Sequence, residues 1–418
     1  MKVQRTVAPT AAPVSFGTLL RALGGLWGGT RHSDRLSREL QLEFSACGVF
    51  LVSSGKAALT VILKALAATS TRRRVVVPAY TCFSVPSAVV KAGLEVILCD
   101  IDPSTLDFDY RELDHLLDGT VLCVLPTHLF GRPADVDRVK TLCIGKGIVV
   151  VEDAAQAMGA LSKGRPIGTL GDLGFFSLGR GKNLTCGTGG IILVNSPAFL
   201  DSVRKEFRTL SDCPFGGAVR NWLEVMAMKI FTHPLLYWFP AGLPFLGLGE
   251  TKFYSDFPIA RMDEIRARLL EGWKDTVTKF NRERIAQASR IVEGLKHHDI
   301  KVSPITSPDD VYLRLPVLVP DRETKRVVCE RGREAGVGLT PNYPTTIQEI
   351  PELQGRIAAR MCPGAQEVVD RLVTLPTHRY VKERDLRNIE RVLTSRGREE
   401  EASDSRHFSR PVEESSHR

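Results

Sequence analysis

The sequence lacks the patterns that mark several common classes of protein. Its nine cysteines include no CxxC pair, so neither a zinc site nor a disulfide framework is indicated, and no metal site is expected. A reduced, cytoplasmic setting follows from the same cysteine usage. The formal charge is +8, but the basic side chains are scattered instead of forming one stripe. Nucleic-acid binding is therefore not expected, while an anionic small molecule or a membrane surface would suit the charge equally well.

Acidic residues are missing from residues 1–33, yet this region makes a poor targeting peptide. Arg21 interrupts its apolar stretch, FGTLLRALGGLWGG, so a secretory signal is less favoured than a structured N-terminal arm over residues 1–47. At the other end, residues 396–418 contain almost no apolar side chains. Such a composition predicts a disordered tail.

An unbroken membrane-spanning run is also missing from the most apolar part of the chain. Residues 222–249 are rich in apolar and aromatic side chains, but Pro234, Pro240 and Pro244 break the run. A buried insertion or a subunit interface is the favoured interpretation. The alternative is an interfacial segment that touches a membrane or a lipid-linked substrate.

Short apolar runs recur from residue 75 onward, with helix-like segments between them. They lie at 75–78, 94–100, 121–126, 148–153, 175–179 and 191–195. This rhythm predicts βαβ units and a largely parallel sheet that is buried on both faces. Right-handed crossovers place the strand ends at one edge, where Asp100, His128, Asp153 and Ser177 would gather as a site.

The organisation expected from these patterns is a large domain followed by a smaller one. Residues 48–265 would form the large domain around the parallel sheet. Residues 262–297 have apolar positions at helical spacing, and the strand-like run DDVYLRLPVLVP follows. Residues 266–395 are therefore predicted to form a smaller α+β domain.

Lys182 stands in the segment GRGKNLTCGTGG, between two apolar runs. A phosphate-binding P-loop would need glycine at Phe176 and serine or threonine at Asn183, and the dinucleotide fingerprint lacks its last glycine. A partly desolvated lysine can instead attack a carbonyl. The most demanding carbonyl cofactor is pyridoxal phosphate, which needs a carboxylate at its ring nitrogen, a phosphate cup and a flat surface against its ring.

The segment VVVEDAAQAMGA can supply the carboxylate. Asp153 ends an apolar run, so its charge would be costly to bury unless a cation such as a pyridinium paired with it. Ala154 and Ala155 would let a flat ring approach, and Gln156 could reach the ring's phenolic oxygen.

The segment LVSSGKAALTVILKAL can supply the phosphate cup. Ser53, Ser54 and Gly55 lead into a helix-like stretch whose first amides suit a phosphate, and Ser177 could donate to the same group. Each signal alone has a plainer explanation: a surface lysine, helix caps, a satisfied strand-end histidine at His128. The order of cup, strand-end acid and strand-flanked lysine favours the cofactor site.

Taken together, these motifs resemble the DegT/DnrJ/EryC1/StrS family of sugar aminotransferases. The resemblance covers residues 48–393, and its most specific block is 149–195, from the Asp-Ala-Ala-Gln box to the Gly-Gly strand. Further blocks in family order lie at 75–109, 125–137, 333–344 and 374–393. The resemblance implies the α/β fold of the fold-type I pyridoxal-phosphate enzymes. That fold has a mostly parallel sheet of the seven-stranded type flanked by helices, plus a smaller α+β C-terminal domain.

The resemblance also implies roles for individual residues. Lys182 would bind the cofactor aldehyde and carry protons, and Asp153 would hold the ring nitrogen. Other cofactor contacts are implied for Ser54, Gly55, Lys56, Gln156 and Ser177, with Tyr80 or Phe83 stacking in place of the aromatic that many members have at Cys82. Substrate contacts are implied for His128, Asn183 and Tyr343.

Two departures from the family pattern concern the phosphate. The family usually has threonine at Lys56, and an asparagine that it commonly supplies to the partner subunit is missing from residues 259–264. The implied assembly is nevertheless a homodimer with shared active sites.

The reaction implied is transfer of an amino group from glutamate, or a similar donor, to a nucleotide-linked keto-sugar during amino-sugar and polysaccharide biosynthesis. A sugar dehydratase of the same fold is one alternative, but that branch replaces the lysine with histidine. A cofactor-binding regulator or scaffold without activity is the other.

Overall fold

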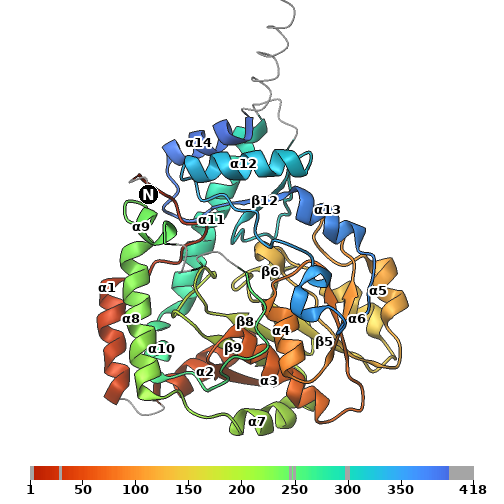
Figure 1. The fold of residues 1–418 in the computed structure, drawn as a ribbon. Coiled ribbons are helices and arrows are strands. Elements are labelled where there is room, and N and C mark those ends of the chain that lie inside the picture. Colours follow the sequence, from red (N-terminus) through yellow and green to blue (C-terminus); the bar gives the residue numbers. More distant parts are fainter. Residues whose placement is uncertain (1–3, 28–30, 244–246, 248–250, 297–301, 395–418) are drawn as a thin grey trace, which may run out of the picture.

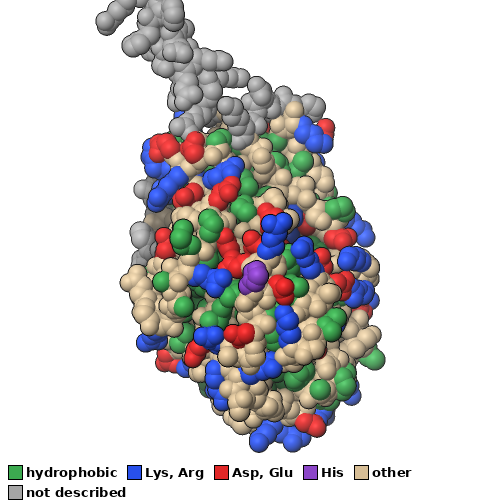
Figure 2. Space-filling model, turned by 90° about the vertical axis from the view of Figure 1, so that its right-hand side faces the viewer, with side chains coloured by type: hydrophobic (Ala, Val, Ile, Leu, Met, Phe, Trp, Pro, Cys, Tyr) green, Lys and Arg blue, Asp and Glu red, His purple; other side chains and the backbone are tan. Residues whose placement is uncertain are grey.

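The computed structural model describes residues 4–27, 31–243, 247, 251–296 and 302–394. The tail predicted to be disordered lies outside the described residues. On the face shown in Figure 2, basic and acidic side chains are interspersed with apolar ones, so this face carries no continuous basic stripe.

A seven-stranded sheet forms the centre of the molecule (Figure 1). The two strands at one edge run antiparallel to their neighbours, and the other five are mutually parallel. The prediction of a mostly parallel sheet is therefore confirmed. In spatial order the strands are β1 (Gly48–Val52), β9 (Gly190–Val194), β8 (Leu173–Ser177), β5 (Val149–Asp153), β4 (Val121–Val124), β2 (Arg74–Pro78) and β3 (Glu95–Cys99).

Helices cover both faces of this sheet because its strands are apolar on both sides. Val75 and Val77 of β2 pack into the cluster under one set of helices, and Val76 between them packs into the opposite cluster. This alternation is the two-residue period of a strand. The first set comprises α3 (Gly55–Ala67), α4 (Ser84–Lys91) and α7 (Leu200–Arg208), and the second comprises α2 (Arg31–Phe44), α5 (Tyr110–Leu116), α6 (Val136–Cys143) and α10 (Glu264–Leu269).

A second, smaller sheet of three antiparallel strands carries its own apolar core. Its strands are β10 (Ser303–Pro304), β11 (Leu315–Leu318) and β12 (Leu372–Leu375). The helices beside it are α11 (Trp273–Lys296), α12 (Arg322–Glu334), α13 (Pro363–Arg371) and α14 (Glu383–Thr394). The expectation of an additional α+β unit in the C-terminal part is confirmed, and the predicted domain boundaries stay predictions.

Short elements complete the chain. A two-stranded ribbon consists of β6 (Leu161–Ser162) and β7 (Arg165–Pro166), and 3-10 turns lie at Leu23–Trp27, Leu129–Gly131, Pro197–Phe199, Ile347–Glu349 and Pro351–Leu353.

The N-terminal segment ties the two sheets together. Val7 lies in the core of the small sheet, and its N–H donates to the carbonyl of Gly336 at 2.7 Å. Leu19, in α1 (Phe16–Ala22), lies in the core under the large sheet. The first residues described therefore form a strap between the two units.

The described part of the apolar stretch at 222–249 contributes to two helices on the surface. It contains the end of α8 (Phe215–Phe231) and all of α9 (Trp238–Ala241), and α8 lies beside α1 (Figure 1). Trp222 donates to the carbonyl of Leu19 at 2.9 Å. Leu223 and Leu235 remain 55% and 59% exposed, so the described part of the stretch is only partly buried. Among the described residues, no helix is both long and apolar enough to cross a membrane.

One of the predicted strand-end site residues has a structural role instead. The carboxylate of Asp100 accepts the N–H groups of Gly364 and Ala365, at 2.8 and 2.7 Å. These are among the first amides of α13, so Asp100 caps that helix and fixes it to the large sheet.

Replacing this cap should weaken the fold. We expect Asp100→Ala to lower the free energy of unfolding by about 1–3 kcal/mol, because two charge-assisted hydrogen bonds to a buried helix end are lost. Urea denaturation measures the change. The control is Asp201→Ala, whose side chain is 94% exposed and which should change stability by about 0.5 kcal/mol or less. Equal effects of the two substitutions would contradict this role for Asp100.

Candidate cofactor and active site

Asp153 ends the central strand β5, and its side chain is buried. One carboxylate oxygen accepts the N–H of Ala155 at 3.0 Å, and the carboxylate forms no ion pair with any described residue. Burial raises the pKa of Asp153, and the positive charge of Lys182 opposes that rise. An acid in this situation lacks a close cation, and the protonated ring nitrogen of pyridoxal phosphate is a cation of suitable size.

Lys182 lies in the loop that joins β8 to β9. Its N–H donates to the carbonyl of Gly179 at 3.3 Å, and the hydroxyl of Thr185 donates to the carbonyl of Leu178 at 3.1 Å. The side chain of Lys182 is half-buried, and it lies within electrostatic reach of Asp153. The structure thus brings the two residues on which the sequence argument rests to one place.

Arg284 holds this loop from the side, and the sequence analysis did not identify it. It projects from α11 and is fully buried. Its guanidinium donates to the carbonyls of Lys182, Asn183 and Ala11, at 3.4, 3.2 and 3.2 Å. Burial lowers the pKa of Arg284 to about 10. One arginine therefore joins the lysine loop, the N-terminal segment and α11, which are far apart in sequence.

The side chain of Asn183 also contributes to this joint. It is buried, and its amide donates to the side-chain oxygen of Asn281 in α11 at 3.2 Å. This geometry favours a structural role over the substrate contact implied by the resemblance.

The N-terminus of α3 forms a cup. Ser54 caps the helix, because its hydroxyl accepts the N–H of Ala57 at 3.1 Å, and the amides of Gly55 and Lys56 bond no acceptor among the described residues. A Cβ atom at Gly55 would lie 2.8 Å from the Cβ of Ser177, so only glycine lets the serine approach this closely. Free amides at the positive end of a 13-residue helix, with a hydroxyl opposite, fit a phosphate group.

Lys56 departs from the expected phosphate contact. Its ammonium lies over the rings of Phe257 and Tyr254, 4.6 and 5.3 Å from their centroids. Burial lowers its pKa. In this conformation Lys56 contributes its backbone amide to the cup, while its charge interacts with aromatic rings.

Aromatic side chains line the region next to Gln156. The ring of Tyr343 stacks with Phe83 and Phe130, with centroids 6.4 and 6.5 Å apart, and Tyr80 lies 5.2 Å away. The amide of Gln156 donates to the hydroxyl of Tyr343 at 2.9 Å and accepts from the N–H of Phe130 at 3.1 Å. Gln156 therefore fixes the position of the Tyr343 side chain. Several of these aromatic rings could supply the flat surface predicted for the cofactor ring.

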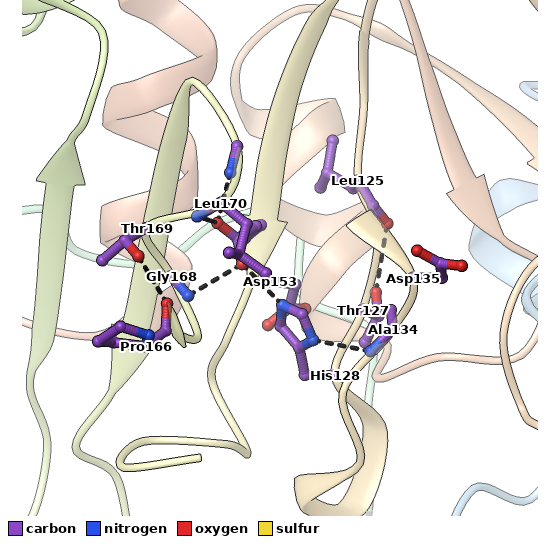
Figure 3. A network of polar contacts seen from close by, with 12 residues as sticks. Leu125, Thr127, His128, Ala134, Asp135, Asp153, Pro166, Gly168, Thr169 and Leu170 are labelled. Atoms are coloured by element: carbon purple, nitrogen blue, oxygen red, sulfur yellow. Dashed lines mark hydrogen bonds and ion pairs between the residues drawn. The ribbon is translucent and has the colours of Figure 1, made fainter. Parts of the chain in front are cut away.

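His128 is satisfied entirely within the protein (Figure 3). One ring nitrogen lies 3.0 Å from the carboxylate of Glu152, and the other accepts the N–H of Ala134 at 3.0 Å. Glu152 in turn accepts backbone N–H groups from Gly168, Leu170 and Gly171. Because both nitrogens are occupied and the ring is fully buried, this geometry favours a structural role for His128 over a substrate contact.

The raised pKa of Asp153 predicts how the stability of the cofactor-free protein depends on pH. An acid whose pKa is higher folded than unfolded destabilises the fold increasingly as pH rises above its unfolded value of about 3.9. We therefore expect Asp153→Asn to raise the free energy of unfolding of the cofactor-free protein at pH 8, by a margin that shrinks as pH falls. Urea denaturation across that pH range measures this difference.

The matched control is Asp118→Asn, which should act in the opposite direction. The hydroxyl and N–H of Thr120 lower the pKa of Asp118, so its carboxylate stabilises the fold above its unfolded pKa. If the cofactor-free Asp153→Asn protein is less stable than wild type at pH 8, the claim that the carboxylate of Asp153 is buried without an ion-pair partner is wrong.

Two known proteins are similar to this chain in sequence. A pleiotropic regulatory protein of Geobacillus stearothermophilus is 32% identical over 316 residues, which cover 74% of this chain and 74% of that protein. A GDP-perosamine synthase of Vibrio cholerae is 27% identical over 171 residues, which cover 41% of this chain and 46% of that protein. This chain thus spans about half the length of that synthase.

A solved structure and a family comparison assign the fold and the family. A sugar aminotransferase of Micromonospora echinospora has a TM-score of 0.74 at 21% identity, covering 94% of this chain and 100% of that one. This likeness confirms the expected fold-type I architecture. The model of the DegT/DnrJ/EryC1/StrS aminotransferase family matches residues 27–394. The chain therefore belongs to the DegT/DnrJ/EryC1/StrS aminotransferase family.

Proposed function

We propose that this aminotransferase, with pyridoxal phosphate as its cofactor, moves an amino group from glutamate or a similar amino acid to a nucleotide-linked keto-sugar in the cytoplasm, for amino-sugar and polysaccharide biosynthesis. The observation that carries the proposal is the buried carboxylate of Asp153 without an ion-pair partner, within electrostatic reach of Lys182. An acid and a lysine in this relation suit a cofactor that has both a ring nitrogen and an aldehyde.

The residues of the site would divide the work as follows. The amides at Gly55 and Lys56, with Ser177, would bind the phosphate, and Asp153 would orient the ring and keep its nitrogen protonated. The amine of Lys182 would hold the aldehyde carbon until the amino donor displaces it, and the freed amine would then carry a proton between the substrate carbon and that carbon. When bound, the cofactor supplies an electron sink for the carbon that exchanges the amine.

The nucleotide-linked acceptor is supported by the likeness to a GDP-perosamine synthase. A regulator without activity has support of its own, because the 32% identical relative is a pleiotropic regulatory protein. The dehydratase alternative is disfavoured because Lys182 stands where that branch has histidine. A measurement of amine transfer distinguishes the enzyme hypothesis from the regulator hypothesis.

A homodimer with shared sites and a peripheral membrane contact through residues 222–249 belong to the same proposal. Leu223, Leu235 and Phe239 are exposed on this segment, which supports contact with another surface. Wild type should sediment with anionic liposomes, and a variant with serine at these three positions should not. Absence of both proteins from the lipid pellet would refute the membrane contact.

Lys182→Ala should abolish amine transfer and the visible absorbance of the bound cofactor, because no amine remains to hold the aldehyde. Circular dichroism and urea denaturation should show an intact fold, since the side chain is only half-buried. The control is Lys205→Ala on the surface of α7, with unchanged absorbance and rate. Turnover by Lys182→Ala would contradict the assignment.

The acceptor can be identified directly. Glutamate should bleach the visible band of the wild-type holoprotein, and one member of a panel of keto-sugar nucleotides should restore it, with an amino-sugar nucleotide detected by mass spectrometry. A visible band that no amino acid alters would instead support the regulator.

A further inference from the structure

Arg314 differs from the other buried arginines of the described residues. Arg132 pairs with Asp310 at 2.7 Å, Arg266 pairs with Asp263 at 3.0 Å, and Arg284 donates to three carbonyls. The guanidinium of Arg314 has no such partner in the part of the chain that the structure describes. Its one hydrogen bond is to the neutral hydroxyl of Thr340, and its Nε bonds nothing.

This cation is buried, since Arg314 is 9% exposed. Taking a guanidinium out of water without an anion is costly, and burial lowers the pKa of Arg314 to about 10. The hydroxyls of tyrosines 80, 237 and 343 act on it electrostatically, and no carboxylate among the described residues forms an ion pair with it. A buried guanidinium with part of its donor fork unused is therefore arranged to accept an anion from outside the protein.

The anion has a place to bind. Arg314 lines a cavity of about 400 Å³ together with Tyr237, Tyr380, Arg180 and Gly181, and the N-terminal segment at 8–14 forms another wall. Arg180 and Gly181 directly precede Lys182 in the sequence. The cavity thus adjoins the lysine loop, and Arg314 also lies within electrostatic reach of Tyr343, whose hydroxyl accepts from Gln156.

We propose that Arg314 binds a carboxylate of the amino-acid donor in this cavity. The inference rests on the proposed function, because it assigns a binding site to the donor of that reaction. The guanidinium fork matches a carboxylate in a two-point contact. The cavity volume lies near the lower end of small-molecule sites, which suits an amino acid better than a whole nucleotide-sugar. A phosphate of the nucleotide is the other oxyanion that the fork could bind.

The test uses the holoprotein and glutarate, a dicarboxylate without an amine that can occupy the donor site but cannot react. Isothermal titration should give glutarate binding to wild type, and Arg314→Gln should weaken it about 10- to 100-fold, as expected for loss of a charge-assisted contact. Arg314→Lys keeps the positive charge but lacks the guanidinium fork, so its affinity for glutarate should lie between those of wild type and Arg314→Gln. If Arg314→Gln does not fold, Arg314→Lys decides the question. The control Arg326→Gln removes an exposed, paired arginine and should bind like wild type.

The outcomes separate this inference from the proposed function. If glutamate bleaches wild type but Arg314→Gln and Arg314→Lys bind glutarate as tightly as wild type, the inference is wrong and the proposed function stands. If the substitutions weaken inorganic phosphate and a nucleoside diphosphate but not glutarate, the carboxylate assignment is overturned. If glutarate binding depends on Arg314 while glutamate leaves the visible band unchanged, the carboxylate site stands and the proposed function fails.

Discussion

The site is built around a carboxylate that the fold buries without giving it a cation. Asp153 is the last residue of a strand in the centre of a sheet covered on both faces, so its backbone position is fixed by pairing with β8. Its charge has one backbone N–H for support, and burial raises its pKa. Such a group lowers the stability of the cofactor-free protein and favours the binding of a cation, a common compromise between stability and function. The lysine loop, the cup and the aromatic residues all lie around this point.

The pieces that surround Asp153 come from distant parts of the chain, and a few buried polar contacts hold them in register. Arg284 of α11 joins the lysine loop to Ala11 of the N-terminal segment. The pair His128 and Glu152 ties the ends of the central strands to the loop at 168–171. Through Arg284, α11 and the N-terminal strap are joined to a site that lies mainly on the large sheet.

Much of the fold was predictable because it depends on local patterns. The apolar runs from residue 75 onward correspond to β2, β3, β4, β5, β8 and β9 of the large sheet, and Ser54 with the alanine-rich stretch after it predicted the capped start of α3. The antiparallel edge formed by β1 and β9 was not predictable, because an apolar strand reads the same in either direction. The position of α13 depends on a cap from Asp100, more than 260 residues earlier in the chain, and no local signal announces such a contact.

The site was predictable where motif and strand end coincide, as at Asp153 and Lys182. The geometry favours structural roles for His128 and Asn183, whose substrate contacts stay predictions, and sequence reasoning could not identify their partners in the fold. It missed Arg284 and Arg314 altogether. Both lie in ordinary helix or strand patterns, and only the absence or presence of partners in three dimensions distinguishes them from surface arginines.

The most direct test of the account is to fix the cofactor where it binds. Borohydride reduction of the yellow holoprotein, followed by proteolysis and mass spectrometry, should place the pyridoxyl group on the peptide that contains Lys182 and on no other. A modified Lys56 with an unmodified Lys182, or no modified peptide at all, would contradict the assignment of the site.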